Sequence, residues 1–245
     1  MPITRRHITL ILLLLPTMAA TSQPHALAEI RSGIETKMHF YETTWVCTGD
    51  TIAFDSTETD GVLCQIDGFW ITCQEVTQDL WMYYMPSNPS AVKGDLLPVT
   101  NVSRASADSL CFEIQFRILE EWSLPTIKEW RYAYEGGIFS EGYKNSGSNN
   151  INFVGWTAHN SNGKLHEGGK LIPNELGIFD MDGNVAEIVT DGDSTRYAGR
   201  TYRSKVIKSK SQLISTTVAP ECCGLRLVWH QPIWFNRNNE RVFRR

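Results

Sequence analysis

The stretch at 173–189 constrains this chain more than any other. It places four oxygen-donor side chains within eight positions: Asp180, Asp182, Asn184 and Glu187. Gly177 and Gly183 supply sharp turns around them. Such donors beside a glycine turn suit calcium, which takes about six to eight oxygens and accepts backbone carbonyls. An EF-hand is excluded, because its glycine belongs at the sixth loop position and Gly183 is fourth from Asp180. The alternative is a surface turn with solvated acids.

Residues 1–28 are typical of an export signal. Two arginines precede a short apolar run at Ile8–Leu15, and an Ala-x-Ala cleavage site lies at 26–28, with a second candidate site at 19–21. The run is too short to cross a membrane, and no later stretch approaches the required length. We therefore expect an exported chain, periplasmic or extracellular and associated with the cell envelope, with no membrane span.

Composition describes one ordinary globular domain. The chain has 245 residues, of which 42% are hydrophobic and 20% charged. Removing residues 1–28 takes away two arginines, so 23 basic residues fall to 21 against 27 acidic residues and the net charge becomes −6. This balance gives no reason to expect nucleic acid as a partner.

All six cysteines lie in the mature part. An even number in an oxidising compartment favours disulfides, although about 15 connectivities are open to six cysteines. Cys64 and Cys73 could staple a hairpin. Cys222 and Cys223 are expected to pair with two different partners, because a bridge between neighbours is strained. No cysteine spacing matches a structural zinc site.

Further motifs follow one another along the mature chain. They are GFWITCQEVT at 68–77, the run from LW to NVS at 80–103, SLPTIKEW at 123–130, the Asn-rich loop at 149–164 and GLRLV at 224–228. Apolar positions recur on one face of a helix expected after Ser103, which predicts a buried stripe. SLPTIKEW carries a T-x-x-E capping box at the start of another helix.

These motifs, in this order and together with 173–189, resemble the formylglycine-generating enzyme family, also called the sulfatase-modifying factor domain family. The resemblance implies an α+β, C-type-lectin-like fold with little regular secondary structure: short strands, two or three helices and long ordered loops. We expect an N-terminal lead-in at 29–43, the family domain at 44–230 and a basic C-terminal tail at 231–245.

The resemblance also implies a calcium site. Carried over by position, the backbone carbonyls of Asp182, Gly183 and Val185 and the carboxylate of Glu187 would bind the ion. The sequence departs from the family at two neighbouring positions, where tryptophan is usual: Ala186 and Ile188.

A second calcium in the family lies near the Asn-rich loop, and Asn160 and Asn162 are the candidates for it. Asparagines that simply make turns are the alternative. His159 and His166 flank this loop and could be ligands, with exposed turn histidines as the alternative.

The oxidase chemistry of the family depends on two cysteines shortly after an Arg-Gly-Gly-Ser turn, which form a copper thiolate site in many members. The corresponding run here is 199–204, and the two cysteine positions fall near Val206 and Ser211. Residues 201–221 contain no cysteine. Because Cu(I) selects soft thiolate ligands, copper is not expected, and no catalytic or cofactor-binding residue is predicted.

Two hypotheses for function follow. The first is a non-catalytic exported member, a pseudoenzyme, whose calcium-braced scaffold binds a protein or glycan ligand or forms part of a cell-envelope complex. Loops on a rigid scaffold are where binding sites commonly lie. The alternative is an active or divergent formylglycine-generating oxidase, which would activate sulfatases. Turnover of a C-x-P-x-R peptide distinguishes the two.

Overall fold

The computed structural model describes residues 68–118, 120–205 and 210–230, with the side chain of Ser211 excepted. Outside these ranges it describes only the backbone of five short strands. The expected export signal and the expected cysteine position at Val206 lie outside the described residues.

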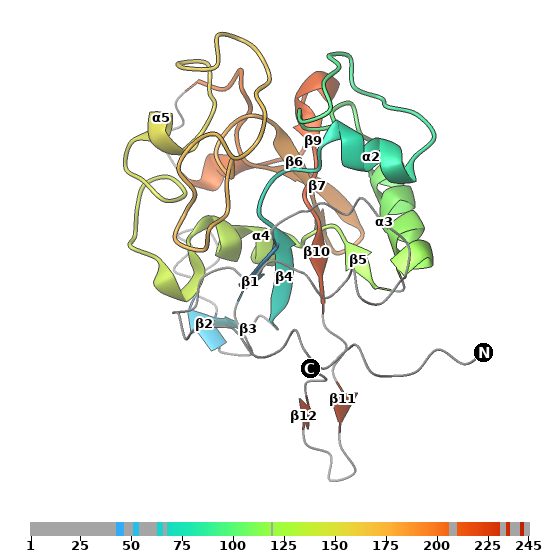
Figure 1. The fold of residues 1–245 in the computed structure, drawn as a ribbon. Coiled ribbons are helices and arrows are strands. Elements are labelled where there is room, and N and C mark those ends of the chain that lie inside the picture. Colours follow the sequence, from blue (N-terminus) through green and yellow to red (C-terminus); the bar gives the residue numbers. More distant parts are fainter. Residues whose placement is uncertain are drawn as a thin grey trace, which may run out of the picture.

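One sheet joins the two ends of the domain (Figure 1). Its strand order is β1-β4-β10-β5, all antiparallel. The strands are β1 (Thr43–Val46), β4 (Phe69–Thr72), β10 (Val228–Trp229) and β5 (Trp122–Ser123). Phe69, Ile71 and Val228 are fully buried, so one face of this sheet packs on the core.

A second sheet has the order β8-β7-β6-β9. Its strands are β6 (Ala186–Asp191), β7 (Ser194–Ala198), β8 (Ile214–Ser215) and β9 (Cys223–Gly224). β6 pairs antiparallel with β7 and parallel with β9. The first four residues of β6 are all buried, and Ala186 and Ile188 lie among them. Two further strand pairs are formed by β2 (Thr51–Ala53) with β3 (Leu63–Gln65) and by β11 (Trp234–Phe235) with β12 (Arg241–Val242).

Three helices of seven or more residues accompany the sheets in the described part of the chain: α2 (Gln78–Tyr84), α3 (Arg104–Ile118) and α4 (Ile127–Tyr134). The expected apolar stripe of α3 is buried at Ala107, Leu110, Cys111 and Ile114. The expected capping box of α4 is also confirmed: Thr126 Oγ1 accepts from Glu129 N at 3.2 Å, and Glu129 Oε2 accepts from Thr126 N at 2.7 Å.

Long loops with short helical turns fill the rest. The turns are η1 (Gly137–Phe139), α5 (Ile151–Val154), η2 (Lys210–Leu213) and η3 (Pro220–Cys222). In Figure 1, α2 and α3 lie on one flank and the loops around α5 on the other. This is the α+β architecture with short strands and ordered loops that the sequence predicts.

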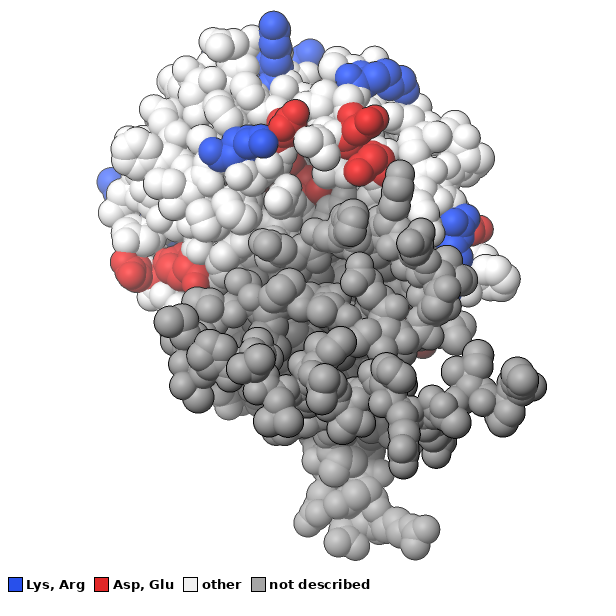
Figure 2. All heavy atoms as spheres, in the orientation of Figure 1, with Lys and Arg blue, Asp and Glu red and all other residues white. Residues whose placement is uncertain are grey.

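The described surface mixes charges of both signs. Figure 2 shows lysine and arginine interspersed with aspartate and glutamate over the described part of one face. None of the described helices is long and apolar enough to cross a membrane.

Candidate functional site

The carboxylate of Glu187 forms a buried ion pair with Arg226. Both side chains are almost fully buried, at 1% and 0% exposed. Arg226 Nε lies 2.9 Å from Glu187 Oε2 and Nη2 lies 2.9 Å from Oε1, while Trp130 Nε1 donates to Oε2 at 2.6 Å. Arg226 also donates to the carbonyls of Thr72 and Phe179. The guanidinium therefore ties β4, the 173–189 stretch and β6 together.

Two further buried carboxylates lie near this pair. Glu75 accepts from Asn184 Nδ2 at 2.7 Å and from Val185 N at 3.1 Å. Burial, with the charges of Asp180 and Glu187, raises the pKa of Glu75 well above 4.5. Asp180 Oδ2 accepts from Gly169 N at 2.7 Å, while Oδ1 is buried without a hydrogen-bond partner. One guanidinium thus faces three carboxylates.

Asp182 belongs to a separate network. Its Oδ2 accepts from Tyr134 Oη at 2.9 Å and from Ser146 N at 2.8 Å, and its Oδ1 pairs with Arg200. The backbone carbonyl of Asp182 lies against Gly155, where an added Cβ would be 1.7 Å from the oxygen. The side chain of Asp182 therefore fastens the turn to α4 and to the loop at Ser146.

The Asn-rich loop is held by its own side chains. Asn160 Oδ1 accepts from Thr157 N at 2.8 Å, and its Nδ2 donates to Gly155 O at 2.9 Å. Asn162 is exposed and has a φ of 54°. Within the part of the chain that the structure describes, neither side chain bonds to the 180–187 turn. His166 stacks on Trp156 at a centroid distance of 3.8 Å.

Metal-binding capacity in this region depends on more than acidic side chains. No group of three or more His, Cys, Asp or Glu side chains among the described residues is arranged to hold a metal ion. A cation near Glu187 would need backbone carbonyls as well, as the carried-over carbonyls of Asp182, Gly183 and Val185 would supply.

The two adjacent cysteines are buried thiols, not halves of two disulfides as expected from the sequence. Cys223 Sγ lies 3.5 Å from Val102 O, and burial raises its pKa to about 12. Burial also raises the pKa of Cys222. A thiol that stays protonated is a poor nucleophile and a poor metal ligand.

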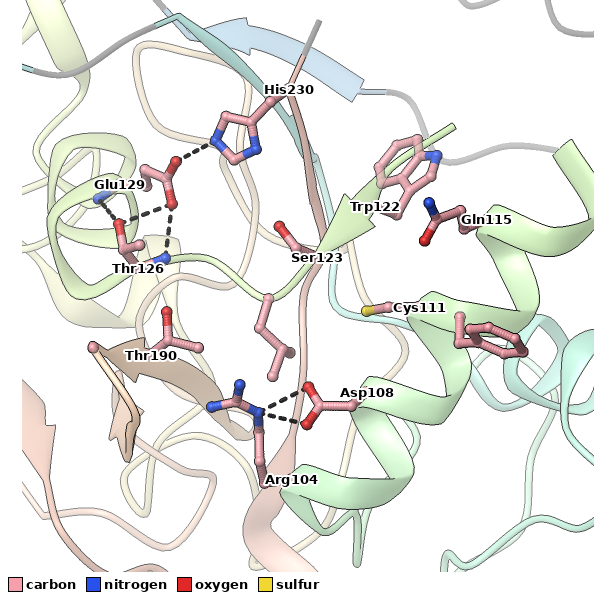
Figure 3. Close-up of a pocket in the computed structure, with 13 residues that line it drawn as sticks. Arg104, Asp108, Cys111, Gln115, Trp122, Ser123, Thr126, Glu129, Thr190 and His230 are labelled. Atoms are coloured by element: carbon pink, nitrogen blue, oxygen red, sulfur yellow. Dashed lines mark hydrogen bonds and ion pairs between the residues drawn. The ribbon is translucent and has the colours of Figure 1, made fainter. Parts of the chain in front are cut away.

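A groove opens between α3 and the start of α4 (Figure 3). Its volume is about 410 Å³. One wall is α3, and the other is formed by β5, the start of α4 and the β6–β7 turn. The groove is lined by Arg104, Asp108, Phe112, Gln115, Trp122 and His230, among others.

Several groove side chains are already paired. Arg104 Nε donates to Asp108 Oδ1 and Oδ2 at 2.8 and 2.9 Å. His230 Nε2 bonds to the carboxylate of Glu129. Burial alone would raise the pKa of Glu129, but hydrogen bonds from His230 and from the Thr126 backbone lower it below 4.5. By contrast, Gln115 and Ser123 have side chains without hydrogen bonds to the described residues.

Known proteins identify this architecture. The chain superposes on Treponema denticola variable protein 1 with a TM-score of 0.63 at 20% sequence identity, over 76% of this chain and 94% of that one. It superposes on CarF with a TM-score of 0.60 at 20% identity, over 78% and 98% of the two chains. PvdO from Pseudomonas aeruginosa gives 0.55 at 18% identity, over 76% and 90%. These likenesses define the fold class, the formylglycine-generating-enzyme or C-type-lectin-like fold.

The family follows from the sequence match. The model of the sulfatase-modifying factor enzyme 1-like domain matches residues 40–229, and the chain belongs to this family. A Paenibacillus barcinonensis protein described as chaperone protein LppX is 31% identical over 172 residues, covering 50% of this chain and 61% of that protein. The chain thus spans less than two thirds of that relative's length.

Sequence reasoning did not assign a role to several residues of these sites. Glu75 lies in the motif at 68–77 and Arg226 in the motif at 224–228. Charged residues inside otherwise apolar motifs are a sequence signal for buried ionic contacts. The polar groove residues on α3 carry no such signal, because they lie outside the buried apolar stripe and outside the quoted motifs.

Proposed function

We propose that this chain is a non-catalytic, exported member of its family that acts as a calcium-braced binding module in the cell envelope. The observation that carries the non-catalytic part is the state of Cys222 and Cys223. They are the only cysteines after residue 200, and both are buried with raised pKa values. A copper thiolate pair needs deprotonated sulfurs that converge on one ion.

The calcium part is supported by the excess of buried negative charge. Glu75, Asp180 and Glu187 face one guanidinium, and one oxygen of Asp180 is buried without a partner. A hard cation would offset this charge. Glu187 and the carbonyls of Asp182, Gly183 and Val185 would hold it, with Asp180 as a further carboxylate nearby, and its contribution would be structural. Because Arg226 occupies both oxygens of Glu187, that carboxylate would be shared between the guanidinium and the ion.

The binding part is supported by the groove beside α3 and by two exposed aromatic side chains on that helix. Phe112 and Phe116 are 64% and 72% exposed and stack at a centroid distance of 6.4 Å. Exposed apolar side chains that lie together in one patch can serve as an interaction surface. The chaperone description of the LppX relative is consistent with a module that binds another molecule.

Two measurements test the proposal. The first incubates the mature protein with a C-x-P-x-R peptide, with and without added copper, and follows the peptide mass; we expect no conversion. The second is metal content by elemental mass spectrometry, in which we expect calcium and no stoichiometric copper. Conversion, or copper bound one to one and lost in a Cys222→Ser/Cys223→Ser variant, would overturn the non-catalytic assignment in favour of the oxidase.

A further inference from the structure

Helix α3 lies on one flank of the fold and has one exposed face (Figure 1). Ala105, Ser109, Phe112 and Phe116 follow the 4-3-4 spacing that keeps side chains on one side of a helix, and all four are exposed. The two phenylalanine rings stack with their centroids 6.4 Å apart. The face therefore has two halves, with short side chains toward the start of α3 and two large rings toward its end.

This pattern is complementary to itself. A second α3 that crosses the face antiparallel sets the bulky half of each helix against the short half of the other. If the contact is centred between Ser109 and Phe112, Phe112 lies against Ser109 of the second copy and Phe116 lies against Ala105 of the second copy. Each ring then fills the space above a short side chain, as in the packing of ridges into grooves. A parallel arrangement would set ring against ring, so the shape favours the antiparallel one.

The polar groups along one edge of this face fit the same arrangement. Arg104 Nε donates to both oxygens of Asp108, at 2.8 and 2.9 Å, and Gln115 lies on the same side of α3 (Figure 3). A two-fold axis across the helices brings each edge of the face against the same edge of the copy. Gln115 of the second copy is then level with the middle of the ion pair. Its amide can accept from the guanidinium and donate to the carboxylate.

We propose that this face of α3 is the contact of a symmetric, antiparallel dimer of this chain. A two-fold contact uses the same patch on both copies, so the patch must be complementary to itself. A helix of this length is about 22 Å long and about 10 Å wide, which is less than the roughly 800 Å² that each partner gives to a standard interface. The dimer should therefore be weak, with a Kd on the order of tens of micromolar. The assignment names a partner for the exposed rings in the binding part of the proposed function and rests on that part.

Sedimentation equilibrium of the mature protein between about 10 µM and 1 mM tests the dimer and gives its Kd. Phe116→Ala should weaken dimerisation about tenfold, because a ring at the centre of the contact is lost. Ala105→Glu should weaken it at least as much, since a carboxylate would lie against the ring of the second copy. An acidic residue in the first turn of a helix complements the helix dipole, so Ala105→Glu should leave α3 folded.

Phe139→Ala is the matched control, because Phe139 is 60% exposed and lies in η1, away from α3. It should dimerise like the wild type. A monomer at every concentration, or a dimer that neither α3 variant weakens, would overturn the proposal. So would a dimer weakened by Phe116→Ala and unchanged by Ala105→Glu, because the ring would then face something other than the start of a second α3.

Peptide conversion separates this proposal from the proposed function. A monomeric protein without conversion overturns the dimer alone. Conversion of the C-x-P-x-R peptide overturns the non-catalytic function, whatever the oligomeric state.

Discussion

The side chains of Asn184 and Glu75 meet across 109 residues of sequence, with Asn184 Nδ2 2.7 Å from Glu75 Oε2. Val185 N donates to the other oxygen of Glu75 at 3.1 Å. Asn184 also bonds to the backbone of His166 through both ends of its amide. These bonds fasten the 173–189 stretch to the segment between β4 and α2 and to the residues that follow the Asn-rich loop.

Replacing Glu75 with alanine should destabilise the fold by about 2–4 kcal/mol, because a buried amide and a buried backbone N–H lose their acceptors. Urea unfolding measured by circular dichroism checks this. Glu113→Ala is the control: its exposed pair with Arg117 spans 3.6 Å on α3 and should be worth about 0.5 kcal/mol or less. Equal losses in the two variants would contradict the role given to Glu75.

Glu187→Gln should cost about 3–5 kcal/mol, because it breaks the buried, hydrogen-bonded ion pair with Arg226. The same urea measurement applies. A Glu187→Leu/Arg226→Met double variant should lose less stability than the sum of the two single variants, because both members of the ion pair are removed together. If the two single losses add in the double variant, the pair is not coupled. Destabilisation by a Glu187 variant therefore does not report on calcium by itself.

Chelation of the wild-type protein is the cleaner test of the calcium brace. If calcium is bound well above its dissociation constant, EGTA should lower the melting temperature by about 5–10 °C, and added calcium should restore it. Asp180→Asn should melt lower and respond little to EGTA, because it removes the carboxylate whose Oδ1 is buried and unpaired. A wild-type melting temperature indifferent to EGTA would exclude the brace.

Acid should weaken the fold through Glu129. Because the folded-state pKa of this carboxyl is lowered from 4.5, its contribution is complete above the unfolded value and is lost as the pH falls through the folded value. Glu129→Gln keeps an acceptor for Thr126 N but has no charge to lose. Melting curves between about pH 3 and pH 6 should therefore fall less steeply in the variant than in the wild type. Parallel curves would show that Glu129 makes no such contribution.

The sequence predicts the parts of this molecule that depend on local pattern. The capping box of α4 and the buried stripe of α3 are both confirmed, because each is set by residues within a few turns of one another. The order of the motifs along the chain was enough to predict the family and the fold class correctly.

The contacts of the sites could not be predicted in the same way. The ion-pair partner of Glu187 is Arg226, which follows β9 in the chain. The spacing of residues within 173–189 gives no information about this partner. The pairing of Trp70 with Trp229 and of Trp229 with Trp122 joins three separate strands, and their register is a tertiary property. The assumption that an exported chain pairs its cysteines failed at Cys222 and Cys223, which the core buries as thiols.

Two loops approach each other closely at Gly155 and Gly183. A Cβ at Gly155 would lie 1.7 Å from Asp182 O, and one at Gly183, where φ is 102°, would lie 2.1 Å from Trp156 O. Neither carbonyl can move without breaking the bond from Asn184 N to Trp156 O or shifting the ion pair of Asp182 with Arg200.

Gly155→Ala should thus cost about 3 kcal/mol or more, measured by urea unfolding. Gly192→Ala is the matched control, because Gly192 has a φ of 56° but nothing within 4 Å of an added Cβ. It carries only the backbone cost of a left-handed alanine, about 1 kcal/mol. If the two variants lose the same stability, the contact between the loops is looser than described, and the 180–187 turn would not be held rigidly enough to position a cation.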